Sequence, residues 1–118
     1  MSTPFGTHIR ARREAIRAQN PDFSLRKVAS RIGVQPSYLS KIERGDEPPP
    51  TEARIRDLAR ELDEDPDILL ALAGKVSKEL QEIIRRRPQL MGDLLRQVKS
   101  LPDHAVIRIV REVRDGDW

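Results

Sequence analysis

The chain contains no cysteine among its 118 residues. Disulfide bridges and cysteine-ligated metal sites are therefore excluded, and a reducing compartment is expected. No apolar run approaches the ~18 residues that cross a bilayer, and the first residues lack the apolar core of a secretory signal. We therefore expect a cytoplasmic protein with no membrane segment.

Aromatic side chains are also scarce, and the chain has only Phe5, Phe23, Tyr38 and Trp118. Aliphatic side chains must therefore supply the hydrophobic core. Proteins that bind single-stranded nucleic acid stack the bases on several aromatic rings. The shortage of rings argues against a single-stranded target.

The chain lacks the residue clusters that carry catalysis or bind metal ions. His8 and His104 lie near opposite ends of the sequence, and no His, Asp and Glu cluster has the spacing of a metal site. The acidic stretch 63–67 lacks the glycine and distal glutamate of a calcium loop, so we interpret it as the capping segment of a helix. No glycine-rich phosphate loop or nucleophile motif is present. We expect neither an enzyme nor a bound cofactor or metal ion.

Charged residues, in contrast, are abundant and unevenly distributed. The net charge is +3, yet residues 1–44 contain nine Lys and Arg against three acidic residues. Residues 45–73 contain three Arg against nine acidic residues. A locally basic surface is typical of proteins that face phosphate groups. The alternative interpretation is that these charges only maintain solubility.

The pattern of apolar residues and helix breakers predicts helices and no strand, because period-2 alternation is not sustained. The expected fold class is therefore all-α. The first five predicted helices cover about residues 5–19, 24–33, 36–45, 51–62 and 65–74, and the last three about residues 77–87, 88–99 and 102–115. We expect one domain over residues 5–74 and a helical extension over residues 75–118.

Residues 25–44, LRKVASRIGVQPSYLSKIER, form the most informative stretch. Val28, Ala29 and Ile32 share the inner face of one predicted helix, and the small Ala29 allows a second helix to cross closely. Gly33 follows, and glycine readily adopts the positive φ of a tight interhelical turn. This pattern predicts a helix-turn-helix.

The second helix of this motif has an apolar inner face and a polar outer face. Leu39 and Ile42 face the core, with Val34 at the corner between the helices. The outer face carries hydrogen-bonding and basic side chains: Gln35, Ser37, Tyr38, Ser40, Lys41 and Arg44. A helix that enters the major groove of DNA needs such side chains. We therefore expect double-stranded DNA as the partner.

Two segments, SYLSKIERG at residues 37–45 and RDLARELDEDPDILL at residues 56–70, resemble the Cro and lambda-repressor type helix-turn-helix family, also called the xenobiotic-response-element family. The resemblance covers about residues 5–74. It implies a five-helix, repressor-like DNA-binding bundle. Family members are mostly dimeric transcriptional repressors that bind palindromic operators, so the resemblance implies the same role here.

The resemblance also implies which residues read DNA bases. The family's base-reading positions fall on Gln35, Pro36, Ser37 and Lys41. Lys41 lies one turn beyond Ser37, where it is able to donate to O6 or N7 of guanine. Pro36 replaces a residue that often reads a base, so direct readout is expected to depend on fewer side chains.

A family ion pair falls on Arg13 and Glu43. The resemblance implies that this pair is partly buried and orients the recognition helix. Removing one partner of a deeply buried pair costs about 3–5 kcal/mol.

Phosphate contacts are expected from residues around the motif: Ser24, Arg26, Tyr38, Arg44, and Arg10 or Arg12. Leu25 stands where many family members have a phosphate-contacting glutamine, so Ser24 or Arg26 would take over that contact. Asp46 and Glu47 replace basic residues that the family often has after the recognition helix. Backbone contacts from this loop are therefore not expected.

The extension is expected to form a homodimer. Val106, Ile109, Val110 and Val113 make an apolar stripe that the small first domain cannot wholly cover. Alternatively, these helices only pad the first domain, or they bind a partner toxin as the tail of an antitoxin that also regulates its own operon. Two further alternatives are a mobile-element repressor removed by a metalloprotease, and an RNA-associated or scaffolding role.

Overall fold

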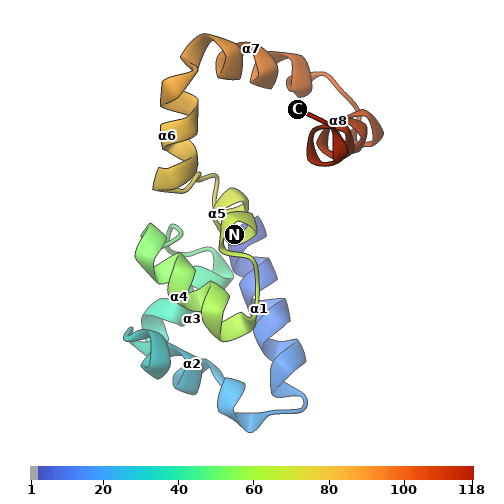
Figure 1. Ribbon diagram of the computed structural model, residues 1–118. Coiled ribbons are helices and arrows are strands. Elements are labelled where there is room, and N and C mark those ends of the chain that lie inside the picture. Colours follow the sequence, from blue (N-terminus) through green and yellow to red (C-terminus); the bar gives the residue numbers. More distant parts are fainter. Residues whose placement is uncertain (1–2) are drawn as a thin grey trace. The chain divides into compact units, whose positions relative to one another are not determined.

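The computed structural model describes residues 3–118, and these residues form helices and no strand (Figure 1). The all-α fold class expected from the sequence is therefore confirmed. The chain divides into two compact units, one that ends at Ser77 and one that begins at Lys78.

The helices of the first unit are α1 (Pro4–Arg17), the 3-10 helix η1 (Pro21–Phe23), α2 (Leu25–Ile32), α3 (Pro36–Arg44), α4 (Glu52–Leu62) and α5 (Pro66–Leu72). The helices of the second unit are α6 (Lys78–Arg86), α7 (Pro88–Lys99) and α8 (Asp103–Asp115). Among the described residues, the α-helices agree in number and order with the eight helices predicted from the sequence.

Local capping explains where the helices begin and end. The side chains of Ser24, Thr51 and Asp65 accept backbone hydrogen bonds at the first turns of α2, α4 and α5. Gly33, with φ of 76°, and Gly45, with φ of 81°, end α2 and α3 in the left-handed conformation. These caps agree with the boundaries predicted from the sequence.

The region around α1 differs from the prediction. The helix begins at Pro4, capped by Thr3 Oγ1, and it ends at Arg17, earlier than expected. The sequence prediction assigns no helix to residues 20–23, but the Asn20-Pro21-Asp22 cluster starts η1, because the Asn20 side chain accepts a hydrogen bond from the backbone N–H of Asp22 at 3.0 Å.

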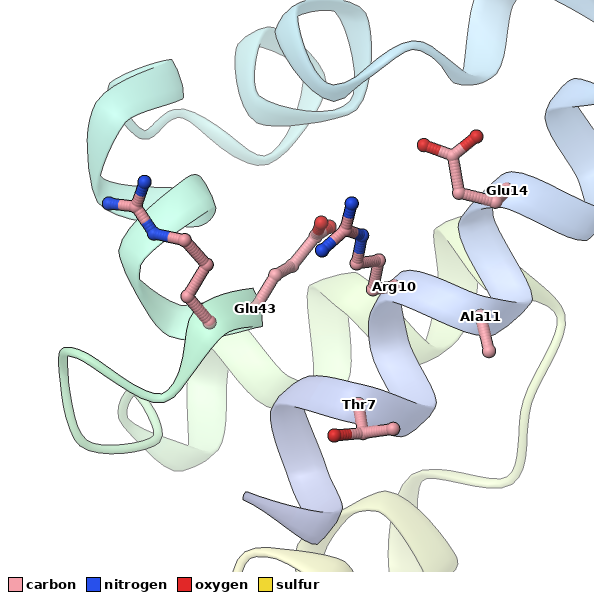
Figure 2. Close-up of a pocket in the computed structure, with 6 residues that line it drawn as sticks. Thr7, Arg10, Ala11, Glu14 and Glu43 are labelled. Atoms are coloured by element: carbon pink, nitrogen blue, oxygen red, sulfur yellow. The ribbon is translucent and has the colours of Figure 1, made fainter. Parts of the chain in front are cut away.

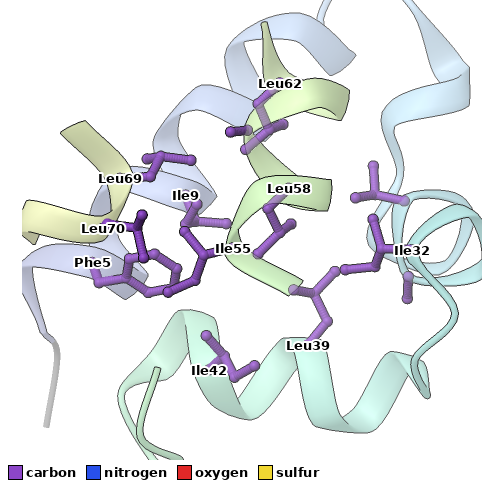
Figure 3. Packing of buried hydrophobic residues seen from close by; sticks show 13 residues of the cluster. Phe5, Ile9, Ile32, Leu39, Ile42, Ile55, Leu58, Leu62, Leu69 and Leu70 are labelled. Atoms are coloured by element: carbon purple, nitrogen blue, oxygen red, sulfur yellow. The ribbon is translucent and has the colours of Figure 1, made fainter. Parts of the chain in front are cut away.

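The core of the first unit is aliphatic apart from Phe5 (Figure 3). The inward-facing residues predicted for the motif all belong to it: Val28, Ala29, Ile32, Leu39 and Ile42. Val34 packs against this core as a partly buried residue, as expected at the corner. Full burial of one large aliphatic side chain stabilises the fold by about 1.5–3 kcal/mol. The buried side chains of α3 therefore hold this helix with its opposite face in solvent.

The second unit has no such core. None of the residues of α6, α7 and α8 is buried. In the predicted α8 stripe, Val106 and Ile109 are half-buried, whereas Val110 is 55% exposed and Val113 60% exposed. None of the helices described is both long and apolar enough to cross a membrane.

Candidate nucleic-acid interface

One face of α3 forms a polar stripe in solvent. Ser37, Lys41 and Arg44 are exposed and recur at the spacing of one helix face. Gln35 is the N-cap residue of α3, is exposed, and makes no side-chain capping bond. Within residues 3–118, the side chains of Gln35, Ser37 and Lys41 have no hydrogen bond or ion pair. Their donors and acceptors therefore remain available to a ligand.

Pro36 occupies the first position of α3 and is half-buried. Its missing N–H is not needed there, and its fixed φ favours the first helical turn. The ring has no donor, so apolar contact is the only base contact that Pro36 is able to make.

A buried ion pair fixes α3 against α1. Arg13 Nε donates to Glu43 Oε2 at 2.8 Å, and Arg13 Nη2 donates to Glu43 Oε1 at 2.9 Å. Only 4% of the Arg13 side chain and 3% of the Glu43 side chain are exposed. Arg13 Nη1 also donates to the backbone oxygen of Phe23 at 3.2 Å. The hydrogen bonding of Arg13 to the Glu43 carboxylate raises the pKa of Arg13 above its ordinary value. This bidentate pairing of Arg13 with Glu43 restrains rotation of α3 about its own axis.

Two arginines of the basic first third are engaged within the fold. Arg12 Nε donates to the backbone oxygen of Leu62 at 3.0 Å, which satisfies the end of α4. Arg31 Nε donates to Glu61 Oε2 at 2.6 Å. Of the two candidates on α1, the structure therefore commits Arg12 to α4 and leaves Arg10 exposed.

Arg54 of α4 is a further positioning residue, and sequence reasoning missed it. Its Nη1 donates to the backbone oxygen of Ile32, the last residue of α2. A Cβ added to Gly33 would lie 3.1 Å from the same Nη1. Arg54 thus braces the turn that leads into α3. Arg54 and Ile32 are 22 residues apart in the sequence, so no local sequence pattern predicts this contact.

Arg10 and Arg44 both line two clefts between α1 and α3. One cleft, of about 250 Å³, is lined by Arg10, Arg13, Leu25, Ser40, Glu43 and Arg44. The other, of about 450 Å³, is lined by Thr7, Arg10, Ala11, Glu14, Glu43 and Arg44. Figure 2 labels the α1 residues that line this second cleft, Thr7, Arg10, Ala11 and Glu14, together with Glu43 of α3. Two cationic side chains at one rim favour anions such as phosphate.

Residues 4–72 match the family of helix-turn-helix domains, which is more than half of the chain. The chain belongs to the helix-turn-helix domain family. Such domains bind DNA and are typically not enzymes, so the family match indicates a DNA-binding regulator. Neither the curated proteins nor the solved structures contain a match to the chain.

The remaining phosphate candidates of this helix-turn-helix protein differ in availability. Arg26 is exposed and has no ion pair within the part of the chain that the structure describes. Ser24 Oγ accepts a hydrogen bond from Lys27 N at 3.3 Å, which leaves its hydroxyl proton to donate. Tyr38 is half-buried and packs against the core. These residues lie on α2, its cap and α3.

Arg44 is held by a neighbour within the helix-turn-helix domain. Its Nε lies 3.1 Å from Asp46 Oδ2, in the loop after α3. Asp46 was noted in the sequence only as an acidic replacement in a loop that is often basic. The structure thus assigns this carboxylate a partner on the candidate DNA-binding surface.

Proposed function

We propose that this protein is a sequence-specific, double-stranded DNA-binding transcription regulator of the Cro and lambda-repressor type, acting as a homodimeric repressor. The observation that carries this proposal is the α3 stripe. The side chains of Gln35, Ser37 and Lys41 are uncommitted within the described residues, while the helix beneath them is held by apolar packing and the buried Arg13–Glu43 pair. A rigid helix with free hydrogen-bonding groups suits the major groove.

In this proposal, the first two turns of α3 read the bases. Gln35 pairs with adenine, whose N6 and N7 offer a donor and an acceptor to an amide. Ser37 bonds to an adjacent base edge, and Lys41 donates to guanine. Pro36 contributes apolar contact beside them.

Phosphate contacts then set the register of the helix on the duplex. We assign these contacts to Arg10, Arg26 and Arg44, with hydroxyl donation from Ser24 and Tyr38. Each cation that neutralises a phosphate releases counterions, so binding should weaken steeply as the salt concentration rises.

We assign residues 5–74 to a five-helix, repressor-like DNA-binding domain and residues 75–118 to dimerisation. The family match over residues 4–72 and the compact unit that ends at Ser77 support the first assignment. The unburied apolar side chains of the second unit support the other. A dimer would place two copies of α3 in successive major grooves, about 34 Å apart. Occupying an operator would block polymerase.

The decisive experiment is selection of bound sequences from a random duplex library, at a stated salt concentration, with the full chain. A palindromic motif with half-sites about one helical turn apart is the expected result. A bound pool without enriched sequence would contradict base reading, and no bound pool at all would contradict DNA binding.

The second candidate function is that of an antitoxin whose extension binds a partner toxin. The absence of buried side chains in α6, α7 and α8 favours it, because such a unit gains stability from any apolar partner surface. Sedimentation of the purified chain separates the two functions. A dimer favours the repressor, and a monomer that recovers apolar burial only with the product of an adjacent reading frame favours the antitoxin.

A further inference from the structure

Arg44 shares the exposed face of α3 with the base-reading candidates, but its charge already has a partner. Arg44 Nε and Asp46 Oδ2 are 3.1 Å apart, and the two side chains are 54% and 47% exposed. A carboxylate at this distance from a guanidinium occupies the position that a phosphate oxygen would take.

The C-terminal turn of α3 places Asp46 beside Arg44. Gly45 turns the chain with φ of 81°. Asp46 N then donates to the backbone oxygen of Lys41 at 2.8 Å, and Glu47 N donates to the same oxygen at 3.3 Å. Two backbone hydrogen bonds thus fix the loop, so the Asp46 carboxylate is delivered to Arg44 without ordering a flexible segment.

We propose that Asp46 is an intramolecular competitor for the DNA phosphate at Arg44 and so limits the affinity of the α3 surface for DNA. This inference rests on the proposed function. Binding of a phosphate to Arg44 requires the Asp46 contact to be broken, and the displaced carboxylate then faces the DNA backbone. Because Arg44 contacts no base in this scheme, Asp46 lowers affinity for specific and random duplexes by the same factor.

The loop supplies its own control. Glu47 is the next carboxylate along the chain, and among the described residues it has no ion pair. Asp46→Asn and Glu47→Gln remove the same charge from adjacent positions, but only Asp46→Asn removes the partner of Arg44. Each is combined with Arg44→Gln, and thermal unfolding establishes that all variants are folded.

The experiment measures binding of the full chain to its selected operator duplex and to a random duplex, over a series of salt concentrations. An exposed ion pair of this kind changes an equilibrium by up to about five-fold. Asp46→Asn should therefore tighten binding to both duplexes by a few-fold, clearly more than Glu47→Gln. The plot of log affinity against log salt should steepen by up to about 0.9, one additional phosphate. The gain should vanish in the Arg44→Gln background.

Two results would overturn the inference alone: a gain no larger than that of Glu47→Gln, or a gain that persists without Arg44. Either would show that Asp46 acts through net charge and not through Arg44. Wild-type protein that binds no duplex would overturn the proposed function and this inference together, and the two failures are therefore distinguishable.

Discussion

Lys41 is the side chain that most directly tests base reading. It is exposed on α3, and no described residue engages its amino group. Lys41→Ala should relax the preference at one base pair and cost about 1–3 kcal/mol of binding free energy on the preferred sequence. Repeating the library selection with the variant measures this change.

Lys99→Ala is the matched control for Lys41, because it removes one positive charge from α7 in the other unit. Its selected motif should equal that of the wild type. If Lys41→Ala also returned the wild-type motif, α3 would not read bases through this residue.

Glu43 and Glu14 both contact Arg13, yet they differ in burial. Glu43 is 3% exposed in its side chain, whereas Glu14 is 45% exposed and lies 3.1 Å from Arg13 Nη2. Glu43→Ala should lower the free energy of unfolding by about 3–5 kcal/mol, because it removes the buried carboxylate that accepts two hydrogen bonds from the buried guanidinium. Glu14→Ala should lower it by less than about 1 kcal/mol. Urea unfolding of both variants makes the comparison, and equal losses would contradict a special role for the buried pair.

The raised pKa of Arg13 sets the direction of the pH effect that the guanidinium of this pair contributes. The hydrogen bonding of Arg13 to the Glu43 carboxylate raises the pKa of Arg13 in the folded state. A raised pKa on a cationic group stabilises the fold at every pH below the unfolded value, and the stabilisation is lost only as the pH rises through the folded value. For an arginine this window lies in strong alkali, so the guanidinium side of the pair stays charged at neutral pH.

At the scale of elements, the turn between α2 and α3 combines two constraints at Gly33. Its φ is +76°, and an added Cβ would lie 3.1 Å from Arg54 Nη1. Gly33→Ala should therefore destabilise the protein by more than the ~1–2 kcal/mol that a left-handed conformation costs an L-residue. Urea unfolding measures the change in the free energy of unfolding.

Gly74 has the left-handed conformation of Gly33 without the close side-chain contact, so it serves as the control. Its φ is +73°, but nothing lies within 4 Å of an added Cβ. Gly74→Ala should show the conformational cost alone. A loss at Gly33 no greater than that at Gly74 would mean that the Arg54 contact does not brace the turn.

At the scale of the whole molecule, we expect the first unit to bind DNA and the second unit to form the dimer. The core lies wholly within α1 to α5, and Ser77 is 2% exposed, so a chain that ends at Ser77 keeps every buried residue. We expect this truncated chain to remain folded and to become monomeric. Loss of the two-site attachment should weaken operator binding by roughly 100- to 10,000-fold. Sedimentation and duplex binding test both effects, and a truncated chain that is still a dimer would contradict the assignment.

A substitution in the full chain avoids the truncation. Val110 is 55% exposed on α8 and belongs to the apolar stripe, whereas its neighbour Arg111 lies outside that stripe. Val110→Glu should dissociate the dimer because it would bury a charge at the interface. Arg111→Glu should leave the dimer largely intact.

Much of the helix-turn-helix was predictable because its signals are local. The inward residues Val28, Leu39 and Ile42 follow helical spacing, and Gly33 marks the turn by its backbone freedom. The extra 3-10 helix was not predictable in the same way, because a stop signal and a short helix share the residue types of the Asn20-Pro21-Asp22 cluster.

The roles of the individual arginines were not predictable from spacing. Arg10 and Arg12 look alike in the sequence, but Arg12 reaches the end of α4, which is 50 residues away. Arg54 similarly reaches the end of α2. A long guanidinium side chain finds its acceptor by proximity in space, and proximity between distant residues follows only from packing.

By itself, the sequence determined the all-helical class, the placement of most caps and the apolar face of each motif helix. These follow from backbone preferences and from the 3.6-residue period, which act over a few neighbouring residues. Only the tertiary structure decided which charges remain available on the surface. It tied Arg12 to the end of α4 and paired Arg31 with Glu61. Charge pairing depends on distances between side chains, and the packed core sets those distances.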